Sequence, residues 1–97
     1  MSGVFKVTAI GPLGQFTVRG QTAKALLRLS DAGKKGVTAQ EVSSWAYRFS
    51  AYCFDLRHKY GLTILTHKEP HEGGWHGRHE LTTPVTILDV KQPQKAA

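Results

Sequence analysis

The chain has 97 residues, of which 40% are apolar and nine are aromatic, enough for one compact core and too few for two independent cores. Thirteen Lys and Arg against seven Asp and Glu give a net charge of +6, spread along the chain, which favours a polyanionic partner such as nucleic acid. A single cysteine excludes an intramolecular disulfide, and no apolar run approaches the roughly 18 residues that a transmembrane helix needs. We therefore expect a soluble intracellular protein with no membrane partner.

Two runs rich in β-branched and aromatic residues, 4–10 and 15–19, come first in the chain. Pro12 and Gly14 between them are typical of a tight turn. Residues 1–20 are therefore expected to form a β-hairpin, or at least one strand, ahead of the first helix.

A helical period of apolar residues follows over residues 21–35. Ala23, Leu26 and Leu27 recur at spacings of three and four and define the expected core face of this helix. Gly33 and the lysines after it are typical of a helix C-terminus, so we expect the helix to end there.

A second, short helix is predicted to begin at Thr38. Thr38 and Glu41 form a capping box, in which the threonine oxygen accepts a hydrogen bond from the amide of residue 41 and the glutamate reaches back. Val42 provides an apolar contact for a helix of about two turns. A tight turn is expected over residues 43–46, where two consecutive serines can satisfy backbone donors.

The third predicted helix covers residues 47–60. Its core stripe has spacings of four, three and four and consists of Phe49, Cys53, Leu56 and Tyr60. Cys53 is thus expected to be a buried thiol. Phe54 lies on the opposite face, where a large aromatic ring needs a partner.

Extended segments dominate the rest of the chain. Residues 62–69 and 77–83 flank a loop over 70–76 that contains paired glycines, a pattern that predicts a long β-hairpin. Residues 85–90 are expected to form a last strand, and residues 91–97 a frayed tail.

Three helices followed by a β-hairpin define an α+β fold, a winged helix-turn-helix with an N-terminal strand or hairpin. We expect one domain over residues 1–90. It divides into N-terminal strands at 1–20, three helices at 21–60 and a wing at 61–90.

The third helix and the hairpin carry side chains suited to contacts with duplex DNA. A short helix fits a major groove about 12 Å wide, where arginine can bond to guanine and small residues approach base edges. Glycines let a loop come close to phosphates, which cationic and donor side chains bind. The candidate residues at the third helix are Ser44, Tyr47, Arg48, Ser50 and Ala51. The candidate residues in the wing are Lys68, His71, Trp75, His76 and Arg78.

Four stretches, at 36–46, 54–58, 60–64 and 69–81, together resemble a known family; the last reads Glu-Pro-His-Glu-Gly-Gly-Trp-His-Gly-Arg-His-Glu-Leu. Over roughly residues 20–83 the sequence resembles small winged-helix proteins of bacteria, many of them encoded by phages or prophages. The resemblance implies a DNA-binding fold in the bacterial cytoplasm or nucleoid. The expected function is sequence-specific binding of double-stranded DNA through the third helix and the wing, as a transcription regulator of phage or mobile-element origin.

Five histidines raise the question of a metal site. His67 and His71 are four residues apart, and His76 and His79 are three apart, which in a strand places them on opposite faces. A structural zinc site uses about four ligands, commonly including cysteine, and Cys53 belongs to another element. We therefore expect hydrogen-bonding histidines, with no metal and no cofactor.

Catalytic motifs are equally scarce. The sequence contains no phosphate-cradling glycine motif with lysine, no Gly-x-Ser-x-Gly elbow, and no carboxylate pair with an obvious common pocket. Cys53 lies on the predicted core stripe, where a thiol is usually inert. We expect no enzymatic activity and no small-molecule substrate.

Two other functions remain open. Winged helices also serve as protein-interaction or assembly modules, and Phe54 offers a partner surface for that role. An excisionase-like architectural factor that bends DNA is the other alternative.

Trp75 either packs on the base of the wing or is exposed and stacks on DNA. Because one short helix binds DNA weakly, we expect a homodimer or a head-to-tail array on DNA.

Overall fold

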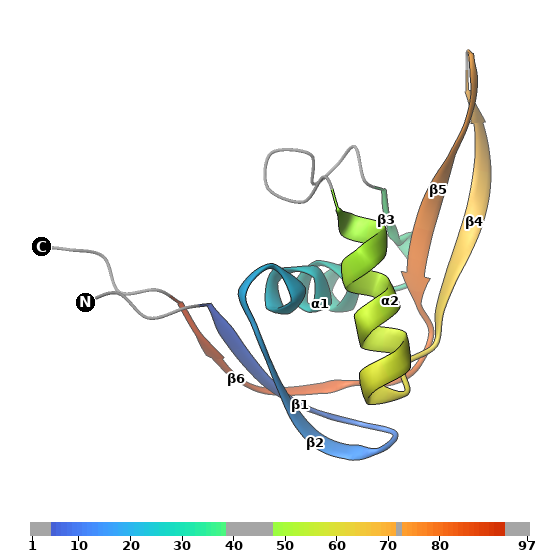
Figure 1. The fold of residues 1–97 in the computed structure, drawn as a ribbon. Coiled ribbons are helices and arrows are strands. Elements are labelled where there is room, and N and C mark those ends of the chain that lie inside the picture. Colours follow the sequence, from blue (N-terminus) through green and yellow to red (C-terminus); the bar gives the residue numbers. More distant parts are fainter. Residues whose placement is uncertain (1–4, 39–47, 72, 93–97) are drawn as a thin grey trace, which may run out of the picture.

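The computed structural model describes residues 5–38, 48–71 and 73–92. In this part of the chain the elements are β1 (Lys6–Gly11), β2 (Gly14–Arg19), α1 (Gly20–Ala32), the 3-10 turn η1 (Gly33–Lys35), β3 (Val37–Thr38), α2 (Phe49–Tyr60), β4 (Ile64–His71), β5 (Gly74–Leu81) and β6 (Thr86–Lys91). The strands form two separate three-stranded sheets, and the two helices lie between them (Figure 1). Neither helix has the length and apolar character needed to cross a bilayer.

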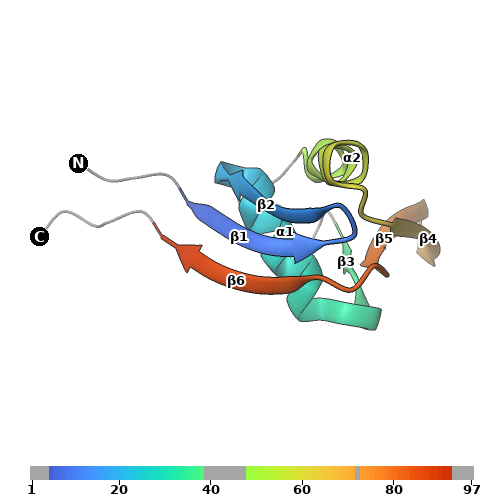
Figure 2. The same ribbon diagram turned by 90° about the horizontal axis from the view of Figure 1, so that it is seen from below.

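The first sheet has the strand order β2-β1-β6 (Figure 2). β1 and β2 form the antiparallel hairpin that the sequence predicts. Val7 and Val18 face each other across it and are buried against the core. Thr8 and Thr17 also face each other, on the opposite side, with their hydroxyl oxygens 3.2 Å apart. The sheet therefore has one apolar face against the core and one polar face outside.

β6 lies in this first sheet and not in the wing, which corrects the predicted wing boundary of 61–90. It pairs with β1, so that Ile87 lies opposite Ala9 and Val90 opposite Val7. Ile87 packs against the core from this position. Burial of this apolar side chain beneath the first sheet gives a physical reason for the pairing.

α1 covers most of the predicted first helix. Ala23 and Leu26 are fully buried, as expected, and so is Leu29. Leu27, expected on the core face, is only partly buried. The α-helix ends before Gly33, which has a positive φ of 54°, and the chain continues as η1. The predicted glycine stop is therefore confirmed, although the α-helix is shorter than expected.

α2 turns toward the core the stripe of residues that its sequence predicts. Three residues of the stripe are buried, namely Phe49, Cys53 and Leu56. Tyr60 is partly buried, and its ring stacks on Phe16 of β2 with 4.6 Å between the centroids. The helix begins at Phe49 rather than at residue 47.

The described residues contain two α-helices, so the prediction of three is not matched there. Residues 39–47, which hold most of the expected second helix and the turn after it, lie outside the described part. Thr38, expected to cap that helix, ends β3 and lies opposite Arg78 of β5. β3 has two buried residues, too few for the alternation that reveals a strand in a sequence.

The second sheet has the order β3-β5-β4, and the β4–β5 hairpin forms the wing. Its strands extend closer to the tip than predicted, because residues expected in a loop are paired, with His71 opposite Gly74. Pro70 is accommodated because β4 is an edge strand, on which a missing backbone donor costs little. The wing is therefore a regular ribbon almost to its tip.

Candidate nucleic-acid interface

The first turn of α2 presents predicted DNA-contacting residues to solvent. Arg48 stands at the N-cap with a non-helical backbone and is exposed, and Ser50 is exposed too. Ala51 is half-buried. Ser44 and Tyr47 lie outside the described residues. Recognition helices enter the major groove with their N-terminal residues, which is the position that Arg48 and Ser50 occupy.

The wing projects beyond the helices, and its turn lies at the same end of the molecule as the start of α2 (Figure 1). Gly73 in this turn has a φ of 89°, which favours glycine. Lys68 on β4 is exposed. The side chains of His71, Trp75 and His76 are outside the described part, so their contacts with DNA stay predictions.

Arg78 makes contacts within the protein that were not predicted from the sequence. Its Nε donates to Glu69 Oε2 at 2.6 Å, and its Nη1 donates to the carbonyls of Lys35 and Gly36 at 3.3 and 3.5 Å. The side chain is 24% exposed. Arg78 thus ties η1 and the start of β3 to the wing. A DNA contact by Arg78 stays a prediction, and this guanidinium has a structural task as well.

Two histidines of the wing form hydrogen bonds, as predicted. His79 Nδ1 lies 3.0 Å from Thr66 Oγ1. His67 Nε2 lies 2.8 Å from Glu80 Oε1. Both pairs join β4 to β5, so these imidazoles reinforce the ribbon.

The surroundings of His79 favour its neutral form. Burial lowers its pKa below the usual value, and the positive charge of Arg57 lowers it further. The imidazole packs against Phe49, with 5.4 Å between the ring centroids. Since the unfolded chain takes up this proton at the ordinary pKa, protonation favours the unfolded state.

We expect the free energy of unfolding to decrease as the pH falls below about 6.5, the ordinary histidine pKa. The contribution of neutral His79 is complete above that pH and is lost as the pH approaches its lower folded pKa. His79→Gln should therefore weaken the pH dependence in this range. Urea denaturation of the wild type and of His79→Gln, at several pH values between about 5 and 7.5, measures the free energy of unfolding and its pH dependence. An equally steep decrease in the variant would assign the effect to another group.

Cys53 lies in the core and is 3% exposed. Burial raises the pKa of its thiol to about 12, against a smaller lowering effect of Arg57. A thiol in this state is protonated near neutral pH and is a poor nucleophile.

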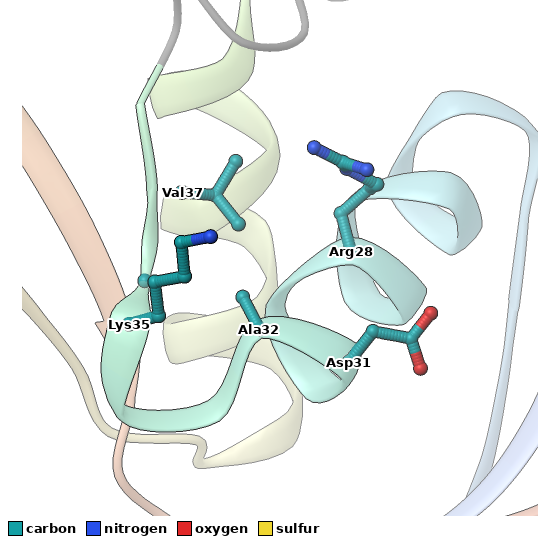
Figure 3. A pocket seen from close by; sticks show the side chains of 6 residues that line it. Arg28, Asp31, Ala32, Lys35 and Val37 are labelled. Atoms are coloured by element: carbon teal, nitrogen blue, oxygen red, sulfur yellow. The ribbon is translucent and has the colours of Figure 1, made fainter.

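A hollow of about 280 Å³ lies between the end of α1 and β3. Its lining consists of Arg28, Asp31, Ala32, Lys35, Gly36 and Val37. Figure 3 shows the nitrogen ends of Arg28 and Lys35 turned toward the hollow, whereas the carboxylate of Asp31 points away from it. The lining provides cations but no thiol, hydroxyl or imidazole. Across the described ranges, no three His, Cys, Asp or Glu side chains gather as metal ligands would.

Phe54 lies on the outer side of α2, as predicted. Phe54 is 55% exposed, and its ring lies against that of His58, tilted by 30° with 4.0 Å between the centroids. The imidazole covers one side of the Phe54 ring, and the rest of this side chain is exposed at the surface.

A three-stranded sheet with a projecting hairpin, next to a helix with an exposed first turn, defines a winged helix module. A family model described as a winged helix domain matches residues 15–91, and the chain belongs to this family. The matched region includes β6 and most of β2, beyond the range of about 20–83 that the sequence motifs cover. No curated protein and no solved structure matches the chain. Winged helix domains are typically DNA-binding modules without catalytic activity.

Proposed function

We propose that this protein binds double-stranded DNA sequence-specifically, with the start of α2 in the major groove and the wing along the backbone. This proposal is based on the position of Arg48 and Ser50, which are exposed at the start of α2, at the end of the molecule where the turn of the wing also lies (Figure 1). A helix first turn reads base edges while a neighbouring loop or ribbon holds phosphates.

The side chains support a division of tasks between the two elements. Arg48 is long enough to bond bidentately to the O6 and N7 acceptors of guanine, and Ser50 bonds to either a base edge or a phosphate. Lys68 is exposed on the wing, where its charge favours the phosphate backbone. The net charge of +6 strengthens association with DNA at low salt.

More specifically, we propose that the protein is a transcription regulator of phage or mobile-element origin that acts in the bacterial cytoplasm or nucleoid. A homodimer or a head-to-tail array on DNA raises the affinity that one short helix provides. The exposed ring of Phe54 is the proposed contact between subunits.

Selection of bound sequences from a random duplex pool, followed by titration at several salt concentrations, tests the function. We expect a preferred site and a steep loss of affinity with salt. Arg48→Ala should weaken binding to that site by about 1–3 kcal/mol and relax the preference at one base pair. Arg28→Ala is the matched control, because Arg28 is an exposed arginine on the other helix, α1.

The same experiment separates the alternatives. Equal binding of all sequences together with strong bending of the duplex indicates an architectural factor. Absence of duplex binding at low salt contradicts the proposal and favours a protein-interaction module, for which exposed Phe54 is the supporting observation. An unchanged affinity of Arg48→Ala for the selected site would mean that another surface reads the bases.

A further inference from the structure

Three cations lie side by side on the polar face of the first sheet. Lys6 of β1 is directly opposite Arg19 of β2 and directly opposite Lys91 of β6. Opposite residues of antiparallel strands have their side chains on the same face. The neighbouring Val7 and Val18 are buried on the inner face, so the three cations point outward. We refer to Lys6, Arg19 and Lys91 as the basic row.

The basic row is not neutralised within the described part of the chain. No ion pair there joins any of its three members to an acidic side chain. Asp89, two positions from Lys91 and opposite Thr8, lies on the same face, so three cations stand against one carboxylate. Like charges directly opposite each other destabilise a sheet. An anionic partner would relieve this repulsion.

The spacing of the basic row suits a nucleic-acid backbone. Neighbouring strands are about 4.8 Å apart, so the row extends over about 10 Å. One strand of a duplex presents a phosphate about every 3.4 Å along the helix axis. With their long, flexible side chains, the three cations of the row can contact up to three phosphates of one strand.

The basic row is separate from the start of α2. Arg19 lines a hollow of about 200 Å³ together with Asp55 and Lys59, which form an ion pair of 4.0 Å. The row thus begins beside the C-terminal half of α2, whereas Arg48 stands at the other end of the helix. Figure 2 shows the outer face of the sheet toward the viewer, with α1 behind it and α2 beyond the β2 edge.

We propose that the basic row is a second DNA contact, which binds the phosphate backbone independently of the start of α2 and the wing. This inference rests on the proposed DNA-binding function. The phosphates belong either to the flank of the duplex that α2 holds, bent around the first sheet, or to a second duplex. In both cases the chemistry is the same, namely three cations on about three phosphates.

The test compares the wild type with the variant K6Q/R19Q/K91Q. The matched control is R28Q/K34Q/K35Q, which removes three exposed cations from α1 and η1. Three measurements are made at several salt concentrations. They are binding of a short duplex that just covers the selected site, binding of a long duplex with flanks on both sides, and capture of a second labelled duplex by protein on an immobilised one.

On the long duplex or in the capture experiment, we expect the basic-row variant to have a shallower slope of log K against log salt. The expected difference is about 2.7, at about 0.9 per phosphate. A change confined to the long duplex identifies the flank as the source, and loss of capture identifies a second duplex. Binding of the short duplex should be unchanged, and the control should behave as the wild type does in all three measurements. The unfolding midpoint of the basic-row variant should not decrease, because the substitutions remove a repulsion.

Slopes equal to those of the wild type on the long duplex and in the capture experiment would overturn the basic-row proposal. A wild type that binds no duplex at all would instead overturn the proposed function, and the basic-row proposal with it. An equal loss in the control would mean that the effect depends on net charge alone. This outcome would also contradict a specific site.

Discussion

Phe49→Ala is expected to lower the free energy of unfolding by about 3–5 kcal/mol. Phe49 is the largest fully buried side chain and the first residue of α2, where it packs against the ring of His79 on β5. Its removal leaves a cavity between the helix and the wing sheet. Small domains have a total stability of about 5–15 kcal/mol, so this one substitution removes a large share of it.

Urea denaturation followed by far-ultraviolet circular dichroism measures the loss, with Phe54→Ala as the control. Phe54 is the same residue type on the same helix but is 55% exposed, so its substitution should change stability by less than about 1 kcal/mol. Alkylation of buried Cys53 offers a second measurement, because a more open core exposes its thiol. Equal losses for the two phenylalanine variants would contradict the placement of Phe49 in the core.

Gly36→Ala is expected to be the second most damaging change. Gly36 has a φ of 71°, which costs a side chain about 1–2 kcal/mol. An alanine Cβ at this position would also lie 2.8 Å from the carbonyl oxygen of His79 and 2.9 Å from Cγ of Arg78. Overpacking of this kind adds about 1–3 kcal/mol. The two effects together should lower the free energy of unfolding by about 2–5 kcal/mol. The substitution acts at the contact that joins β3 to β5.

Gly33→Ala isolates the steric part of this effect. Gly33 also has a positive φ, of 54°, but its Cβ would meet no atom within 4 Å. The control should therefore lose only the conformational part, about 1–2 kcal/mol. Denaturation midpoints of the two variants, compared with the wild type, give the difference. Equal losses would show that β3 and β5 approach each other less closely than the structure indicates.

Strong local periodicity made much of the fold predictable. The stripe of Phe49, Cys53 and Leu56 follows the turns of a helix, and the structure buries all three. The N-terminal hairpin was predictable because Pro12 and Gly14 mark a turn between two β-rich runs. Both signals depend only on residues close together in the sequence.

The missed features depend on contacts between distant segments. β3 is too short to show a period, and the pairing of β6 with β1 leaves no mark in either strand alone. The inward contacts of Arg78 required knowledge of how η1 lies against the wing. Of the candidate site, Arg48 and Ser50 lie off the periodic core stripe of the third predicted helix and are exposed, and the choice of DNA-contacting residues stays a prediction.

The pairing of β6 with β1 also has a consequence for synthesis of the protein. Lys6 and Lys91 lie opposite each other although almost the whole described chain separates them, so this closure carries a large loop-entropy cost. During translation, β1 cannot pair with β6 until β6 has left the ribosome. A nascent chain that stalls before that point has a complete wing but an unfinished first sheet, and its exposed strand edge is open to pairing with other chains.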